Sequence, residues 1–156
     1  MDKPLQGKWA LILGASSGFG AATAKALAAA GANICGVHLD LRSTIANANA
    51  VMDAVRAEGR KAVFFNINAA DPAKRAEAIE AMAKETAADG SFIRVLLHSL
   101  AFGALQPVIA EDPKQALSQR QLEMTLDVMA NSLIYWTQDL VGRGLLRRHS
   151  RIYAMT

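Results

Sequence analysis

The chain topology is set by the stretch from Lys8 to Gly20, which reads K-W-A-L-I-L-G-A-S-S-G-F-G. Its first part, up to Gly14, is a short apolar run stopped by glycine, as expected of a strand buried on both faces of a parallel sheet. An alanine-rich segment then runs from Gly18 to Ala30 and ends at Gly31, which predicts a helix packed closely on that sheet. The stretch therefore predicts a strand, a glycine-rich turn and a helix.

The same alternation repeats along the chain. Apolar runs rich in β-forming residues predict further strands at 32–39, 61–67, 92–98 and 151–155. Between them lie helical patterns that end at Gly59, begin at Asp71-Pro72, and extend from about Ser118 to Val141. Helical connections between short strands force parallel pairing, so we expect one α/β domain over 1–156. Its doubly wound, Rossmann-like sheet of five strands has the predicted order 3-2-1-4-5.

Composition excludes several classes of protein. A chain of 156 residues with 52% hydrophobic residues can bury a full core, which rules out intrinsic disorder. Cys35 is the only cysteine, so no internal disulfide or cysteine-based zinc site can form, and a reducing cytoplasm fits. His38, His98 and His149 fall on separate elements, so we expect no metal site. No apolar run approaches the ~18 residues of a membrane span, and a net charge of +3 without a long basic block disfavours nucleic acid.

The glycine loop, residues 14–20, has the spacing GxxxGxG between the first strand and the first helix. Glycine lacks a Cβ, so a phosphate can approach the backbone N–H groups and the positive end of the helix. A dinucleotide pyrophosphate suits such a site, whereas the simpler alternative is a tight turn that lets the helix pack on the sheet. We expect Ser16 and Ser17 to hydrogen-bond phosphate or to cap the helix.

This loop, in its place after the first strand, resembles that of the short-chain dehydrogenase/reductase family, and the resemblance spans nearly the whole chain. It implies an oxidoreductase that uses NADH or NADPH. Asn68, after the third strand, stands where the family usually has an aspartate that contacts the adenine amino group. Asn131, in Ala130-Asn131-Ser132, matches the helix asparagine of the family's catalytic tetrad. The resemblance places these residues at the cofactor: Gly14, Ser16, Ser17, Gly18, Phe19, Gly20, Asn68, His98, Ser99 and Leu100.

The end of the fourth strand points to two branches of this family. His98-Ser99-Leu100-Ala101 replaces the common Asn-Asn-Ala-Gly and is similar to the enoyl-acyl-carrier-protein reductases, which implies an enoyl thioester substrate and fatty acid biosynthesis. The glycine spacing and Asn131 instead favour a 3-ketoacyl or general carbonyl reductase. A non-catalytic dinucleotide-binding sensor or scaffold is a third hypothesis. His98 itself is either a polar group beside the cofactor or a strand-end histidine with a hydrogen-bond partner.

Residues just past the second strand bear on the choice of cofactor. An acidic side chain there can bind the ribose 2′-OH and a basic one the 2′-phosphate, and the sequence offers both, as Asp40 and Arg42. Because no basic residue lies between Gly14 and Gly20, we give NADH a slight preference. Our hypothesis is that Asp40 selects against the extra phosphate.

The helix expected at 118–141 carries apolar residues around much of its surface. Leu122, Leu126, Met129, Leu133 and Leu140 form one stripe, and further apolar side chains lie elsewhere, so we expect burial on more than one side. By resemblance, this helix associates with its counterpart in a second subunit. The alternative is burial by another helix of the same chain.

The final residues, 151–156, resemble the strand that precedes the family's catalytic serine, but the sequence ends at Thr156. The Ser, Tyr and Lys of the family's active site therefore have no counterparts here. We expect the chain to be the amino-terminal part of a longer reductase, inactive alone. The 151–155 strand would then be an open edge beside an uncovered apolar face, so that the isolated chain would be poorly soluble or dependent on a partner.

Overall fold

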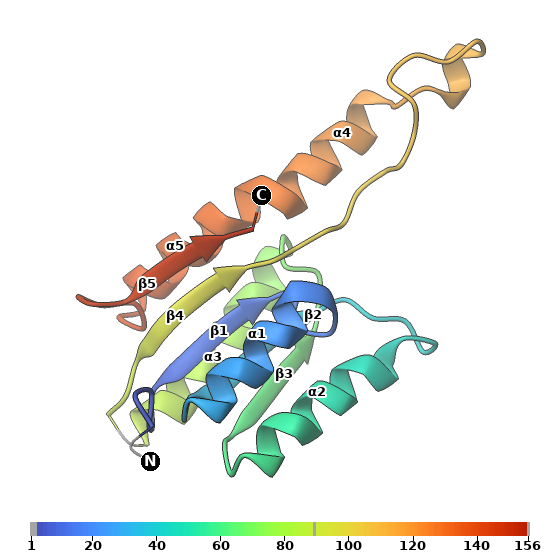
Figure 1. Cartoon of the computed structure of the whole chain (residues 1–156). Helices are drawn as coiled ribbons and strands as arrows, with labels where there is room; N and C mark the ends of the chain where they lie inside the picture. Colours follow the sequence, from blue (N-terminus) through green and yellow to red (C-terminus); the bar gives the residue numbers. More distant parts are fainter. Residues whose placement is uncertain (1–2, 89, 156) are drawn as a thin grey trace.

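A computed structural model describes residues 3–88 and 90–155 of the chain; Thr156 lies outside the described residues. The predicted sheet is confirmed, because its strands pair in parallel in the order β3-β2-β1-β4-β5 (Figure 1). The bounds of the strands are β1 Trp9–Leu13, β2 Asn33–His38, β3 Ala62–Asn66, β4 Ile93–His98 and β5 Arg151–Ala154.

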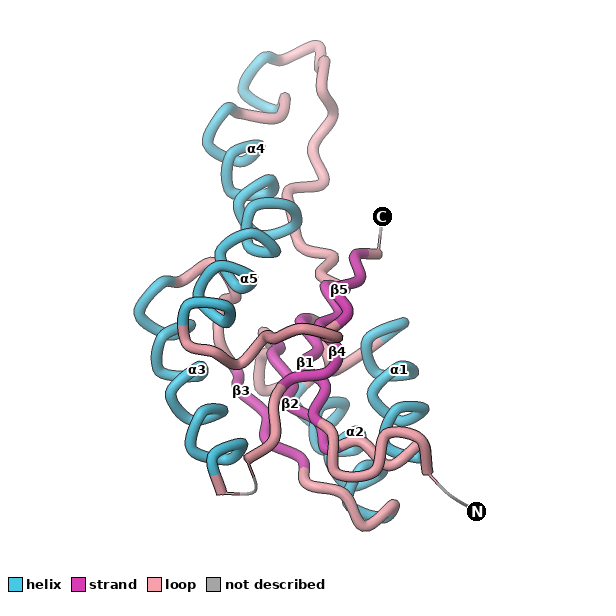
Figure 2. The backbone as a smooth tube through the Cα atoms, turned by 90° about the vertical axis from the view of Figure 1, so that its left-hand side faces the viewer, coloured by secondary structure: helices cyan, strands magenta, loops and turns pink. Residues whose placement is uncertain are grey.

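Helices cover both faces of this sheet, as Figure 2 shows, so the doubly wound architecture is confirmed. On one face lie α1 (Gly18–Ala29) and α2 (Ile45–Ala57), and on the other lie α3 (Pro72–Ala87) and α5 (Ser132–Gly142). Asp71 caps α3 as its sequence predicts, because its Oδ1 accepts a hydrogen bond of 3.0 Å from the Lys74 amide and Pro72 follows directly. The remaining helical pieces are η1 (Pro113–Gln115), α4 (Gln119–Leu126) and η2 (Asp127–Asn131).

The core lies on both sides of β1, whose five residues are all buried. Leu11 and Leu13 pack in the cluster beneath α3 and α5, while Ile12 packs in the cluster beneath α1 and α2. This arrangement explains why β1 has no polar residue, since a central parallel strand is enclosed on both faces. Cys35 is fully buried in β2, and its burial raises the pKa of the thiol far above the ordinary value, so it behaves as a small apolar residue.

The helix expected at 118–141 is not a regular α-helix. It consists of α4, the π-helical segment η2 and α5. Its buried stripe is Val128, Ser132, Trp136 and Leu140, four residues apart, whereas Leu122 and Leu126 are exposed. In the described chain the expected burial on more than one side is not observed, because Met129, Ile134 and Val141 are exposed as well. No helix in the described ranges is both long and apolar enough to cross a membrane.

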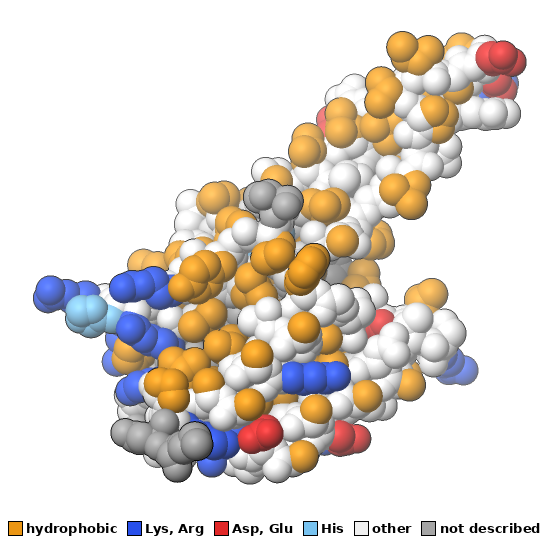
Figure 3. Space-filling view, in the orientation of Figure 1, with side chains coloured by type: hydrophobic (Ala, Val, Ile, Leu, Met, Phe, Trp, Pro, Cys, Tyr) orange, Lys and Arg blue, Asp and Glu red, His pale blue; other side chains and the backbone are white. Residues whose placement is uncertain are grey.

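Several surfaces of the described chain expose apolar side chains, among them the arm and the sheet face over β4 and β5. The arm, residues 101–126, stands away from the sheet in Figures 1 and 2, and its Leu105 is 100% exposed. The second surface is the sheet face over β4 and β5 beside α1, where apolar side chains gather in Figure 3. A groove there is lined by Leu27, Val95, Leu97, Tyr153 and Met155, among others.

Candidate functional site

A cleft opens where the loops that follow β1, β2, β3 and β4 meet, at the carboxyl ends of the strands. The strand order reverses here, because β2 and β3 lie on one side of β1 and β4 and β5 lie on the other, and such switch points are where open α/β sheets bind ligands. The cleft encloses about 300 Å³. Its walls are Gly14, Ser16, Ser17, Gly18, Phe19, Val37, His38, Leu39, Asp40, Ile67, Asn68, Ala69, Ser99, Leu100, Ala101, Phe102 and Val128.

Gly14 makes the close approach between the glycine loop and β4 possible. It has a φ of 91°, and a Cβ at this position would overlap the Ser99 carbonyl oxygen. Its N–H donates to the Val37 carbonyl at 2.8 Å, as does that of Ala15 at 3.0 Å. The backbone amide of Gly14 is therefore committed to the sheet, and the residue contributes space to the cleft.

The donors that remain for an anion lie one turn later, at the start of α1. The first hydrogen bond of this helix runs from the Ala21 amide to the Ser17 carbonyl at 3.0 Å, so the N–H groups of Gly18, Phe19 and Gly20 precede the helical pattern. Gly20 is required at this turn because a Cβ there would overlap the Gly14 carbonyl oxygen. These three amides, the positive helix end and the absence of an acidic residue in the first turn favour a negatively charged ligand.

Ser17 occupies the N-cap position of α1, yet its side chain makes no capping hydrogen bond. Of the two roles predicted for this serine, the structure therefore leaves the hydroxyl available for a ligand in the cleft. Ser16 lines the same wall and lies close enough to Asp40 for hydrogen bonding to its carboxylate.

Asp40 is held in the cleft by residues of β2 and β3. Its Oδ2 lies 2.8 Å from Nδ1 of His38, and its amide donates to Oδ1 of Asn66 at 2.8 Å. The Asn66 amide group returns a 3.0 Å bond to the Asp40 carbonyl. Burial raises the pKa of the Asp40 carboxyl, but hydrogen bonds from Thr44, Ser16 and His38 outweigh that effect, so the pKa lies below its ordinary value. The group is an ionised acceptor at neutral pH.

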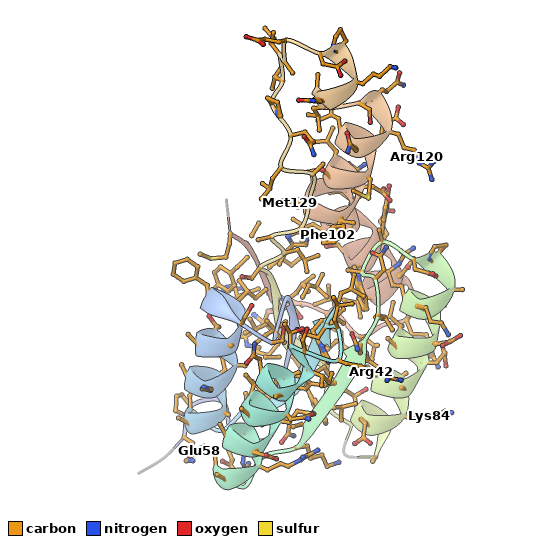
Figure 4. The ribbon with its side chains drawn as sticks, turned by 90° about the vertical axis from the view of Figure 1, so that its right-hand side faces the viewer. Arg42, Glu58, Lys84, Phe102, Arg120 and Met129 are labelled. Atoms are coloured by element: carbon orange, nitrogen blue, oxygen red, sulfur yellow. The ribbon has the colours of Figure 1, made fainter. Side chains whose placement is uncertain are left out.

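Arg42, the rival determinant of cofactor choice, does not line the cleft. Its side chain is exposed on the loop before α2, where Figure 4 labels it. Only the acidic member of this predicted pair therefore faces the cleft.

Asn68 lines the opposite wall, in the turn between β3 and α3. Its Oδ1 accepts from the Ala70 amide at 2.9 Å, which leaves one lone pair of that oxygen for another donor. The next residue, Ala69, anchors the wall to the helix layer, because its carbonyl accepts a 2.9 Å bond from the buried Trp136 indole. The loop that carries Asn68 is thus fixed from both sides.

At the end of β4, Ser99 and Leu100 line the cleft, while His98 lies beneath it and is only 2% exposed. The His98 Nε2 lies 2.9 Å from the Ser132 hydroxyl on α5. Burial lowers the pKa of the His98 ring, although nearby backbone acceptors partly oppose this effect. Of the two roles proposed from sequence, the structure shows the strand-end histidine with a buried partner.

Asn131 is not brought to the cleft. Its side chain is exposed, on a surface hollow shared with Arg120 and Met124, while Val128 on the same segment lines the cleft. Figure 4 shows Arg120 pointing out from the arm. A catalytic role for Asn131 stays a prediction that rests on the resemblance.

Several residues of the site were not anticipated from sequence. Asn66 ends β3 and could have been found by the rule that ligands lie at the carboxyl ends of strands. Val128 and Ser132 lie in or beside a π-helical segment. The spacing of apolar residues does not predict such a segment, because one π-helical turn changes the helical period only slightly. In the described part of the chain, no group of three or more His, Cys, Asp or Glu side chains is arranged to hold a metal ion.

Comparison with known proteins agrees with this geometry. The family model described as short chain dehydrogenase matches residues 8–152. The chain belongs to the short chain dehydrogenase family. A curated relative, the 2-dehydro-3-deoxy-D-gluconate 5-dehydrogenase of Bacillus subtilis, is 34% identical over 149 residues, which are 95% of this chain and 52% of that protein. The chain therefore spans about half the length of this relative.

Two solved structures share the fold. A short chain dehydrogenase from Burkholderia cenocepacia J2315, in complex with NADP, is 28% identical with a TM-score of 0.78. The match covers 96% of this chain and 55% of that one. A blue fluorescent protein from a metagenomic library, in complex with NADPH, is 25% identical with a TM-score of 0.76; the match covers 96% of this chain and 56% of that one. The resemblance to the short chain dehydrogenases and the expected Rossmann-like fold are thereby confirmed.

Proposed function

We propose that this chain is the dinucleotide-binding part of an NAD(P)-dependent oxidoreductase that reduces an enoyl thioester or a carbonyl. The observation that carries the proposal is the cleft itself, which is lined by Gly18 and Phe19 at the start of α1, where the backbone amides precede the helical pattern, and by the ionised carboxylate of Asp40. That pairing suits a ligand with a diphosphate and a ribose hydroxyl side by side. When bound, the nicotinamide supplies the hydride.

Each part of the chain has a distinct task in this proposal. The amides of Gly18, Phe19 and Gly20 donate to the diphosphate, and Asp40 accepts from the ribose 2′-OH. Asn68 lies beside the adenine, and Ser99 to Phe102, with Val128, form the wall at the nicotinamide end. Leu100, Phe102 and Val128 exclude water from that end, which keeps the hydride donor in an apolar environment.

The cofactor preference follows from Asp40. A 2′-phosphate placed against an ionised carboxylate is repelled, and Arg42, which would offset this repulsion, is not part of the cleft wall. We therefore favour NADH over NADPH. In Asp40→Asn, which keeps the size but removes the charge, the ratio of NADPH to NADH dissociation constants should fall about tenfold, a change worth ~1.4 kcal/mol.

Calorimetric titration with both reduced cofactors tests the preference. Asp53→Asn is the matched control, because this aspartate is exposed on α2 and pairs only locally with Arg56. Equal affinity for NADH and NADPH in the unaltered protein, unchanged by Asp40→Asn, would refute the selection by charge.

Two substrate classes are supported by different observations. His98-Ser99 at the end of β4 supports an enoyl thioester, as in the enoyl-acyl-carrier-protein reductases. The glycine spacing, Asn131 and the Bacillus subtilis relative, which is named for a 5-dehydrogenase activity on a sugar acid, support a 3-ketoacyl or general carbonyl substrate. Crotonyl-thioester and acetoacetyl-thioester assays on the protein that contains this chain separate them. Cofactor binding without turnover of either would favour the sensor hypothesis.

The helix α4–η2–α5 is also proposed as the surface on which two copies of the chain associate. Leu126 and Met129 are exposed on it, together with Ile134 and Val141 farther along α5. Such a row of apolar side chains on a monomer commonly marks an interface. A pair of identical helices meeting about a two-fold axis would cover the same residues on both copies.

A further inference from the structure

A buried hydrogen-bonded pair links the sheet to the helix layer directly beneath the cleft. His98 is the last residue of β4, Ser132 is the first residue of α5, and the exposures of their side chains are 2% and 0%. The Nε2 of His98 lies 2.9 Å from the Ser132 Oγ. Polar groups buried this deeply are costly unless each is hydrogen-bonded, so the direction of every bond matters.

The Ser132 hydroxyl fixes that direction. Its Oγ donates to the Val128 carbonyl at 2.7 Å, and a hydroxyl carries only one proton. The bond with His98 must therefore run the other way, with the imidazole Nε2–H donating to the Ser132 Oγ. This direction requires a neutral ring with its proton on Nε2, so that the hydrogen bonds run from Nε2 through the Ser132 hydroxyl to the Val128 carbonyl.

The π-helical turn changes the backbone hydrogen bonding beside Val128. The Ser132 backbone N–H, which an α-helix would direct to the Val128 carbonyl, donates instead to the Asp127 carbonyl five residues back. The Ser132 side chain supplies the replacement donor. The pair thus stabilises the π-helical segment η2 and the position of Val128, whose side chain lines the cleft.

The His98 backbone is itself held from both sides. The next amide, that of Ser99, donates to the Leu13 carbonyl of β1 at 2.8 Å, and the Met155 amide donates to the His98 carbonyl at 2.9 Å. The imidazole therefore extends from a backbone position that is fixed in the sheet, and its hydrogen bond to Ser132 connects the sheet to the end of η2. Leu13 immediately precedes the glycine loop, so the same point connects both walls of the cleft.

We infer that His98 and Ser132 form a buried positioning pair that sets the distance between Val128 and the glycine loop, and so the width of the nicotinamide end of the cleft. The inference rests on the proposed dinucleotide function. It assigns no contact with the cofactor to either residue. Their effect on the cleft passes through Val128, whose side chain lines it.

Binding of two ligands of different length tests this role. ADP fills only the diphosphate and adenosine part of the cleft, whereas NADH reaches the Val128 wall. In His98→Leu and Ser132→Ala the dissociation constant for NADH should rise about tenfold, the expected effect of losing a buried hydrogen bond, while that for ADP stays within about twofold. His98→Gln places an amide N–H at a similar reach and should restore NADH affinity to within about threefold.

A matched control separates positioning from general loss of structure. Thr137→Val removes a 2.7 Å side-chain bond to the Leu133 carbonyl on the same helix, away from the cleft. It should leave both dissociation constants unchanged. Equal losses for ADP and NADH in His98→Leu, or an NADH loss of the same size in Thr137→Val, would overturn the positioning role.

Nuclear magnetic resonance tests the pair without any ligand. Long-range nitrogen–proton correlations of the His98 ring should show a protonated Nε2 and an unprotonated Nδ1 at neutral pH. Amides of residues 128–133 should exchange faster with solvent in His98→Leu than in the unaltered protein. If the unaltered protein binds no dinucleotide, the proposed function fails by itself; a proton on Nδ1, or unchanged amide exchange, overturns the pair.

Discussion

Glycine residues, which have no side chain, determine how closely the walls of the cleft approach each other. Gly20→Ala places a Cβ against the Gly14 carbonyl oxygen, and backbone cannot move aside as a flexible side chain can. We expect a loss of about 2 to 3 kcal/mol in the free energy of unfolding, together with loss of NADH binding. Denaturant unfolding and calorimetry measure the two effects.

Gly142→Ala is the control for that substitution, because nothing lies within 4 Å of the added Cβ at the end of α5. Alanine there should be neutral or stabilise by up to about 1 kcal/mol, since it favours the helix. A Gly20→Ala protein as stable as Gly142→Ala would contradict the close packing of the loop.

Single titratable residues also determine how the stability of the folded chain depends on pH. Burial lowers the pKa of His98 below its ordinary value of 6.5, so as the pH falls below that value the unfolded chain takes up a proton that the folded chain refuses. Stability is therefore complete above about pH 6.5 and is lost progressively below it. The lowered pKa of Asp40 acts in a separate window, below 3.8.

Thermal unfolding between about pH 8 and 5 tests this expectation, with His98→Gln as the comparison, because glutamine does not titrate. The drop in melting temperature on acidification should be smaller in the variant than in the unaltered protein. An identical pH dependence in both would show that His98 takes up its proton equally well in the folded chain.

At the scale of elements, sequence predicts the sheet well because its strands are apolar runs that end in glycine or polar residues. The periodicity of residues 8–30 is enough to predict β1 and α1, and Asp71-Pro72 predicts the start of α3. The helix after the arm is predicted less well. Its burial is decided by Ser132 and Trp136, which meet polar partners from β4 and the β3–α3 turn, and such long-range bonds leave no local pattern.

Trp136 offers a test of how far that helix supports the cleft. Trp136→Phe keeps an aromatic ring in the core but removes the 2.9 Å bond to the Ala69 carbonyl, leaving a buried acceptor without its donor. The free energy of unfolding should fall by about 1 to 3 kcal/mol. Amides of the loop around Asn68 should also exchange faster. Unchanged exchange there would mean that α5 does not hold this wall.

At the scale of the whole molecule, the exposed apolar surfaces fall on two different sides, and they predict different assemblies. Leu126 and Met129 lie on the helix proposed as an interface, whereas Ile152 and Tyr153 lie on β5, which pairs in the described chain only with β4. An exposed sheet edge promotes unspecific association, while a helix face gives a closed dimer.

Charge substitutions distinguish these outcomes. Leu126→Glu places a charge at the proposed helix interface, and the sedimentation coefficient of the dimer should shift to that of the monomer at micromolar concentration, because a buried unpaired charge is costly. Ile152→Lys on β5 is the matched control, similarly exposed at 46% against 49%, and should leave the dimer intact while raising solubility. Dissociation by Ile152→Lys, with Leu126→Glu still dimeric, would move the interface from the helix to the edge of the sheet.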